Sequence, residues 1–159
     1  EDKTLWKYEH KKGKLIRRYI KLPKGLWKDS NIMWGRDTLN GKLYTSDCEG
    51  KIFSFSEEHG FSGVLARVPA PPVGPMAVTF DGRVFGTFGE GICRIFCYDP
   101  DAGAKNISDL GVAVSVIERR RYGYNFGDAV IGHDGEIIFG ENDDLGHIWL
   151  YFPKIKNVR

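Results

Sequence analysis

The densest group of potentially reactive side chains is the segment ENDDLGH, from Glu141 to His147. Its carboxylates belong to Glu141, Asp143 and Asp144, and it also contains Asn142 and His147. Ca²⁺ takes about 6–8 oxygen ligands, so these three carboxylates are candidate metal ligands. The spacing and the glycine position differ from those of an EF-hand loop. Because Asn, Asp and Gly are also common turn residues, a simple polar turn is the favoured alternative, and no cofactor is expected.

A second group of candidates begins with a run of three arginines. Its candidate ligand-binding residues are Arg119, Arg121, Tyr122, Tyr124, Asn125 and Asp128. Guanidinium groups present a planar fork to carboxylates and phosphates, and tyrosine rings offer flat faces for sugars. The group therefore predicts a polar site for an anionic sugar. The alternative is a solvated loop whose tyrosines pack on a sheet edge.

Trp27 is a third candidate, because its ring could stack on a ligand. The favoured alternative is that it packs between sheets. The sequence contains no His-Glu-x-x-His, no Cys-x-x-Cys and no phosphate-binding glycine loop. Sequence motifs therefore do not decide whether the chain is an enzyme.

The composition argues against two classes of partner. The 159 residues carry a net charge of +2, so no nucleic-acid partner is predicted. No apolar run approaches the roughly 20 residues of a membrane helix, so no membrane partner is predicted either. The cysteines, Cys48, Cys93 and Cys97, are too few and too odd in number for a disulfide framework. The compartment stays open.

The elements that would position these residues are indicated by an internal repeat. A frame of an apolar residue, an aromatic, any residue and another aromatic, followed by a polar turn and glycine, occurs as LWKYEHKKG, IFSFSEEHG and IFCYDPDAG. Its strand half returns as IWLY at Ile148. The recurring aromatics are predicted to be packing residues: Trp6, Phe53, Phe96 and Trp149.

A second marker recurs in register with the first. Each later unit has one tight hairpin turn, at Asn40-Gly41, Asp81-Gly82 and Asp134-Gly135. The two markers together predict antiparallel units of up to four strands. These are a half unit at 1–22, full units at 31–68 and 74–111, and a three-stranded unit at 126–155. The segment 112–121 is expected to be an extended connection.

These units resemble the blades of a β-propeller and are broadly similar to kelch, NHL and quinoprotein repeats. The fold class predicted is all-β, with four-stranded antiparallel blades in a partial ring. The resemblance implies that ligands meet the face made by the loops between strands two and three and by the loops that join blades. On this chain those segments are 47–51, 89–93, 141–147, 23–30, 69–74 and 112–125.

Propellers close rings of about 4–8 blades, and this chain supplies two full blades with incomplete blades at both ends. The expected partners are therefore other blades, either from a longer polypeptide or from a second copy. Because the chain starts with Glu1 rather than Met, the sequence favours the C-terminal part of a longer propeller.

The leading functional expectation is a non-catalytic binding or scaffold domain that uses the loop face for a saccharide or protein partner. The alternative is a propeller-type polysaccharide lyase or hydrolase. In that case Tyr124 or His147 would be the base, and Arg121 would neutralise a substrate carboxylate. Convergence of these three side chains in one pocket would favour the enzyme.

Overall fold

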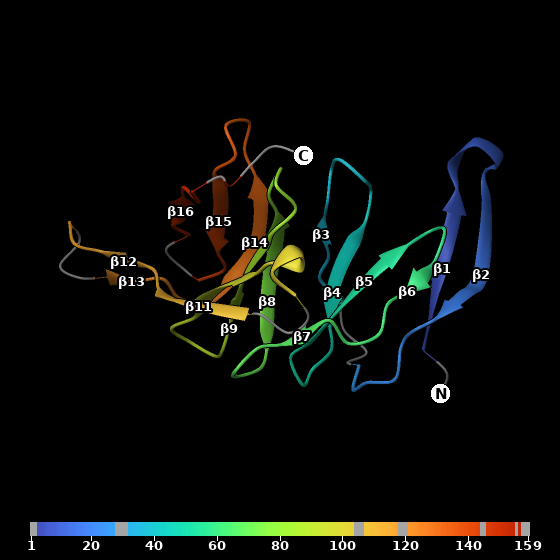
Figure 1. Ribbon diagram of the computed structural model, residues 1–159, viewed down its shortest axis with the longest axis horizontal. Helices are drawn as coiled ribbons and strands as arrows, with labels where there is room; N and C mark the ends of the chain where they lie inside the picture. Colours follow the sequence, from blue (N-terminus) through green and yellow to red (C-terminus); the bar gives the residue numbers. More distant parts are fainter. Residues whose placement is uncertain are drawn as a thin grey trace.

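The computed structural model describes residues 3–27, 32–103, 107–117, 121–143, 146–154 and 156. These residues form antiparallel sheets and two single-turn 3-10 helices, η1 (His10–Lys12) and η2 (Pro100–Ala102). The sheets lie side by side in a row, which Figure 1 shows from the blue hairpin to the red end of the chain. The all-β fold class predicted from the repeat is confirmed.

The row starts with a hairpin that stands apart as a two-stranded sheet. Its strands are β1 (Thr4–Glu9) and β2 (Lys14–Lys21). Gly13 adopts φ 58° in the turn between them. Lys7 forms an ion pair of 2.9 Å with Glu57 of the next unit, which ties the hairpin to that unit.

The first full blade has an interrupted outer strand. Its strands are β3 (Gly35–Arg36), β4 (Leu43–Ser46), β5 (Lys51–Ser56), β6 (Gly60–Phe61) and β7 (Ala66–Arg67). The sequence predicted continuous strands at 31–38 and 61–68. The second is split because the hydroxyl of Ser62 accepts the backbone N–H of Ser54 at 2.9 Å, so a side chain replaces the backbone ladder there. Residue 31 lies outside the described residues.

The central blade is a complete four-stranded sheet. Its strands are β8 (Val73–Val78), β9 (Val84–Phe88), β10 (Arg94–Tyr98) and β11 (Ile107–Val112), in the order β11-β10-β9-β8. Both faces of its strands β8, β9 and β10 are largely buried, whereas β11 is exposed or half-buried. Alternate residues of β8, β9 and β10 face opposite sides of the sheet, and each side joins a different apolar cluster.

The last sheet has three strands, as the sequence predicted. They are β14 (Phe126–Ile131), β15 (Ile137–Glu141) and β16 (Ile148–Tyr151), and we call this sheet the end blade. The segment before it was expected to be a plain extended connection. It instead folds back as a small hairpin of β12 (Val114–Ser115) and β13 (Arg121–Tyr122).

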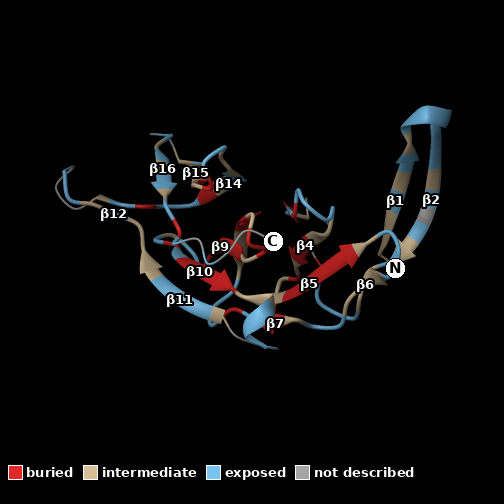
Figure 2. Ribbon diagram, turned by 45° about the horizontal axis from the view of Figure 1, so that its top comes forward, coloured by how far each residue is buried: buried red, intermediate tan, exposed pale blue. Residues whose placement is uncertain are grey.

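The inner strands bring the blades together. β8 contacts both β14 and β3, so the first strands of neighbouring blades lie next to one another, as the arrangement in Figure 1 also shows. One apolar cluster fills the space between the first and central blades, around Ile52, Met76 and Phe96. The other fills the space between the central and end blades, around Phe85, Ile137 and Phe139. The cores therefore lie between blades. Figure 2 shows the buried strands that border them, β5, β9 and β10, in red.

The turn marker is confirmed by backbone geometry. Gly41, Gly82 and Gly135 have φ of 72°, 80° and 86°, a region that glycine enters without steric cost. The aromatic marker is confirmed at Phe53 and Phe96, which are 1% and 0% exposed.

The packing prediction for Trp6 is wrong, since Trp6 is 56% exposed. It lies on the hairpin at the start of the row, where the described residues place no further sheet against it. Trp149 is partly buried and packs on the cluster between the central and end blades.

The three cysteines are free. Within the described residues, no helix is both long and apolar enough to cross a membrane.

Candidate functional site

Arg121 joins the two groups of residues that the sequence predicts as separate sites. It comes from β13, and its Nη2 lies 2.8 Å from the Asp143 carboxylate and 3.4 Å from that of Glu141. Both carboxylates belong to the β15–β16 loop region, 20 and 22 residues further along the chain. The predicted sugar-binding arginine and the predicted metal ligands therefore form one cluster, which we call the Arg121 cluster.

Glu141 is the centre of the Arg121 cluster, and its side chain is fully buried. Its Oε1 accepts the backbone N–H of Tyr124 at 2.7 Å. Its Oε2 lies 3.2 Å from Nδ1 of His147. One buried carboxylate thus holds the joining segment, the inner loop and β13 in a fixed relation.

Backbone hydrogen bonds fix the same region. Asn125, whose φ is 45°, donates its N–H to the carbonyl of Gly91, and its own carbonyl accepts the N–H of Asn142. The ring of Tyr124 lies against Gly91, where an added Cβ would come within 3.2 Å of it. Residues between blades therefore clamp the inner loop of the central blade to that of the end blade.

This contact between inner and joining loops recurs along the row. The Cys48 N–H donates to the Leu26 carbonyl, and the Gly89 N–H donates to the Pro72 carbonyl. The loops that the propeller resemblance assigned to one face do contact one another in each unit.

The geometry gives only part of a metal site. Ligand atoms of Glu141, Asp143 and His147 lie within 4.8 Å of one another. The guanidinium of Arg121 already supplies positive charge beside both carboxylates. Two carboxylates and an imidazole also fall well short of the 6–8 oxygens that Ca²⁺ prefers. The third predicted ligand, Asp144, lies outside the described residues.

The other predicted ligand-binding residues are not all gathered in this cluster. Tyr122 and Tyr124 are each 44% exposed. Asp128 is exposed on β14, where its carboxylate accepts the N–H of Ala129. Arg119 lies outside the described residues.

Trp27 packs in the interior. Its ring is 9% exposed and lies 5.4 Å from the ring of Phe53, centroid to centroid. Its indole N–H donates to the carbonyl of Pro23. Trp27 therefore packs mainly as a core residue, although it also lines a surface pocket with Pro23 and Leu26.

A groove of about 410 Å³ runs along β16. It lies between β16 and the β12 segment, and His147 lines it. The remaining lining residues are mostly apolar: Val114, Ser115, Val116, Ile117, Ile148, Trp149 and Leu150. Arg121 and Tyr124 do not line this groove, so the three candidate catalytic residues do not share it.

A second polar network was not predicted from the sequence. Asp81 and Arg83 of the β8–β9 turn form an ion pair of 2.6 Å. Arg83 also donates to the carbonyl of Lys154, and the backbone N–H of Lys156 donates to Asp81. The ammonium of Lys156 pairs with Asp99. These contacts hold the segment after β16 against the central blade.

Charge and burial shift the pKa values in this network. Burial opposes ionisation of Asp81, but hydrogen bonds from Arg83, Thr79 and the backbone of Lys156 outweigh it and hold the pKa well below its usual range. Burial raises the pKa of the nearby Cys97 thiol to about 11. Cys97 is therefore a neutral thiol at physiological pH and a poor nucleophile.

Comparison with known proteins gives similarity in structure alone. No known sequence family matches the chain, and no curated protein matches it by sequence. Among solved structures, the chain is similar to a streptogramin B lyase, with a TM-score of 0.56 and 16% sequence identity. It is also similar to a selenomethionine-substituted virginiamycin B lyase from Staphylococcus aureus, with a TM-score of 0.48 and 13% identity.

The matches cover 88% of this chain, and they cover 45% and 60% of the two lyase chains. The chain thus spans about half the length of the structures that it matches. At this level of identity the similarity shows the fold. The sheets are β-propeller blades, and the row that they form corresponds to part of a propeller.

Proposed function

We propose that this chain is a non-catalytic binding or scaffold domain that works within a propeller ring completed by further blades. Its loop face, with the exposed Tyr122 and Tyr124, takes a saccharide or protein partner. The observation that supports this function best is the internal neutralisation of Arg121. Because its guanidinium pairs with both Glu141 and Asp143, it acts as a structural clasp between the joining segment and the inner loop.

The positions of the candidate catalytic groups support the same function. A lyase needs a cation that neutralises the substrate carboxylate, and a base within hydrogen-bond reach of the proton that it removes. Arg121 is committed to two protein carboxylates. His147 lines the apolar groove along β16, whereas Arg121 and Tyr124 lie outside it.

The alternative function, a polysaccharide lyase or hydrolase, has two observations in its favour. The imidazole of His147 lies 3.2 Å from a fully buried carboxylate, that of Glu141, which would orient the ring as a base. The fold is also similar to that of a streptogramin B lyase, with a TM-score of 0.56. In this alternative His147 would be the base.

One experiment separates the two functions. The purified chain is passed over immobilised uronate-containing polysaccharides and, in parallel, incubated with the same polymers. We expect retention without turnover, where turnover is followed by the ultraviolet absorbance of unsaturated ends and by new reducing ends. A Tyr122→Ala, Tyr124→Ala variant should lose retention. The control is Phe152→Ala, because Phe152 is also an exposed aromatic but lies after β16.

Turnover that disappears in a His147→Ala variant would refute the non-catalytic function and establish the enzyme. Equal retention of the tyrosine variant and the native chain would refute a saccharide site on this face.

A further inference from the structure

The end blade exposes an apolar face at one end of the row. Val130 pairs with Ile138 across β14 and β15, and Ile138 pairs with Leu150 on β16, so the three side chains share a face. Ile148 lies two residues from Leu150 on the same strand. Ile148 and Leu150 are 72% and 58% exposed. We call these four residues the end face.

At the opposite end of the row the hairpin strands β1 and β2 are half-buried or exposed, as Figure 2 shows by their tan and pale blue. The hairpin exposes an apolar face there. Trp6 and Tyr8 are 56% and 60% exposed, and Leu15, which pairs with Tyr8, is exposed beside it. The guanidinium of Arg17 lies 5.4 Å from the centre of the Trp6 ring. We call these four residues the hairpin face.

The two ends carry opposite charge, although the whole chain is nearly balanced. Between Thr4 and Lys21 there are seven lysines and arginines and one glutamate, a net charge of +6. Between Phe126 and Tyr151 there are six aspartates and glutamates and no lysine or arginine, a net charge of −6. Arg121 offsets part of this negative charge at the loop face. The small net charge of the chain therefore results from a positive end and a negative end of the row that nearly cancel.

We infer that the hairpin face of one copy of this chain docks on the end face of a second copy, and that two such contacts close a ring of two copies. This deepens the proposed function, since it rests on a ring completed by further blades and names their source. Aromatic and aliphatic side chains fit the centre of such an interface, and complementary charge speeds and orients the encounter.

The number of sheets favours two copies. Each copy supplies the hairpin and three larger sheets along the row. Propellers close with about 4–8 blades, which two copies satisfy, whereas three copies would exceed it. The contact joins different surfaces of the two copies, and contacts of this kind form a closed ring when the rotation between copies closes.

The first test is the solution mass of the full chain by light scattering on a sizing column, over a range of protein and salt concentrations. We expect a species of twice 18.0 kDa at low salt, and dissociation as salt screens the opposite charges. A Leu150→Ser variant should weaken association by at least about tenfold. The control is Leu39→Ser, because Leu39 is also 58% exposed but lies in a turn away from both faces.

A charge exchange gives a second test that does not depend on apolar packing. Arg17→Glu reverses a charge on the hairpin face, and Asp128→Lys reverses one on the outer side of β14. Each variant alone should associate more weakly than the native chain. An equimolar mixture should regain association, because each mixed pair has one native contact and one contact with both charges reversed.

A monomer at every concentration, with the folded thermal transition intact, would overturn the inference and would assign the missing blades to another polypeptide. Association that neither salt nor the Leu150 and charge variants alter would overturn it as well. Neither outcome affects the non-catalytic function, which the turnover assay tests separately.

Discussion

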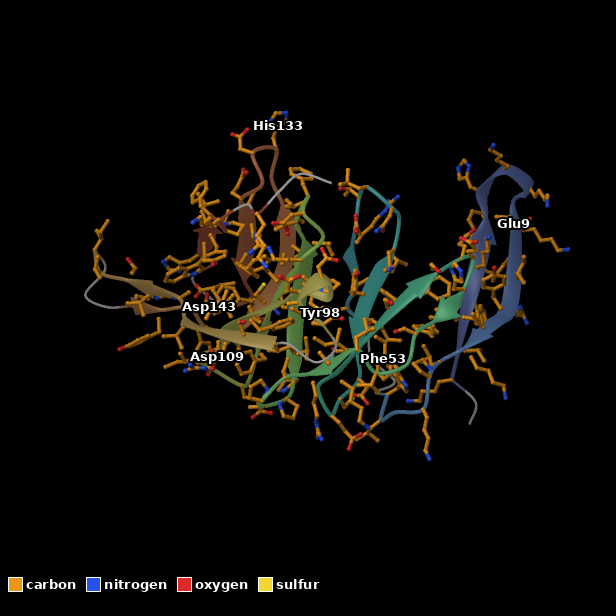
Figure 3. The ribbon with its side chains drawn as sticks, viewed as in Figure 1. Glu9, Phe53, Tyr98, Asp109, His133 and Asp143 are labelled. Carbon is orange, nitrogen blue, oxygen red and sulfur yellow. The ribbon has the colours of Figure 1, made fainter. Side chains whose placement is uncertain are left out.

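At the scale of single residues, the polar contacts that matter most join parts of the chain that are far apart in sequence. Glu141 is fully buried and depends on Arg121 for charge compensation, 20 residues earlier. Figure 3 labels Asp143, the other carboxylate that Arg121 contacts, on the side of the molecule where the β12–β13 hairpin lies. A buried carboxylate that loses its cation leaves an uncompensated charge in the interior.

We therefore expect Arg121→Met to lower the free energy of unfolding by about 3 kcal/mol, measured by urea denaturation. The double variant Arg121→Met, Glu141→Gln should recover much of this loss, because the amide removes the charge and keeps an oxygen for the Tyr124 N–H. The control is Arg94→Met, whose ion pair with Asp109 is exposed and should be worth only ~0–1 kcal/mol. Equal effects of the two single variants would contradict a structural role for Arg121.

If the Arg121 cluster is an ion-pair clasp, divalent cations should add little to it. We expect the Tm of the native chain, followed by calorimetry, to be the same with Ca²⁺ as with a chelator, because Arg121 already neutralises Glu141 and Asp143. If Ca²⁺ raised the Tm by several degrees, and an Asp143→Asn variant lost this increase, the metal site predicted from the sequence would be established instead.

The Asp81 network predicts a dependence of stability on pH. Hydrogen bonds from Arg83, Thr79 and Lys156 lower the pKa of Asp81 in the folded state, despite its burial. Its contribution to stability is therefore complete above the unfolded pKa of about 3.9 and is lost as the pH falls below it. We expect the difference in unfolding free energy between the native chain and Asp81→Asn to shrink from about pH 6 to pH 2. A constant difference over this range would contradict the assignment.

The sequence supplied the members of the Arg121 cluster but not their arrangement. The segment 141–147 and the arginine run were recognised separately, because each is dense in polar residues. Their union depends on the β12–β13 hairpin, whose strands of two residues each are too short to leave a periodic pattern. The Asp81 network had no sequence signal, since its contacts to residues 154 and 156 join positions more than 70 apart.

At the scale of elements, the glycine at position 86 of β9 leaves room for side chains of the two neighbouring strands. Gly86 on β9 faces the cluster between the first and central blades. A Cβ at this position would lie 2.7 Å from Met76 and 2.8 Å from the ring of Phe96. A Cβ added at Gly140 on β15 would have no heavy atom of another part of the chain within 4 Å.

We expect Gly86→Ala to destabilise the fold by about 1–3 kcal/mol, because both neighbours are fully buried and the core must open to admit a methyl group. The matched control Gly140→Ala should leave the unfolding midpoint nearly unchanged. The comparison is made by thermal denaturation of both variants. A tolerated Gly86→Ala would mean that Met76 or Phe96 repacks without cost.

The strands that could be predicted well are those with the strongest repeat markers. β5, β10 and β16 contain the predicted aromatic strands, and the turn glycines fixed the hairpins before β4, β9 and β15. The outer strands were predicted poorly where a side chain takes the place of the ladder, as Ser62 does. Trp6 was assigned to a core because it shares a repeat position with Phe53. Repeat position fixes the direction of a side chain, but burial also needs a neighbouring sheet.

At the scale of the whole molecule, the row of sheets has one element with little support. A two-stranded hairpin is marginally stable on its own, and β1 and β2 form such a sheet at the exposed start of the row. Strands β8, β9 and β10 of the central blade are covered on both faces and are the opposite case. Local stability should therefore differ strongly along the chain.

Hydrogen exchange followed by mass spectrometry tests this gradient and the association of copies together. In dilute solution at high salt we expect the amides of β1 and β2 to exchange through local opening, much faster than those of β9 and β10. Raising the protein concentration at low salt should slow exchange in β1, β2 and β16, because the hairpin and end faces become covered, and leave β9 unchanged. Arg17→Glu is the control, since it should weaken the concentration dependence. If the hairpin amides were as protected as those of β9 in dilute solution, the stability gradient would be contradicted. The ion pair of Lys7 with Glu57 and the packing behind it would then suffice to fix the hairpin to the first blade.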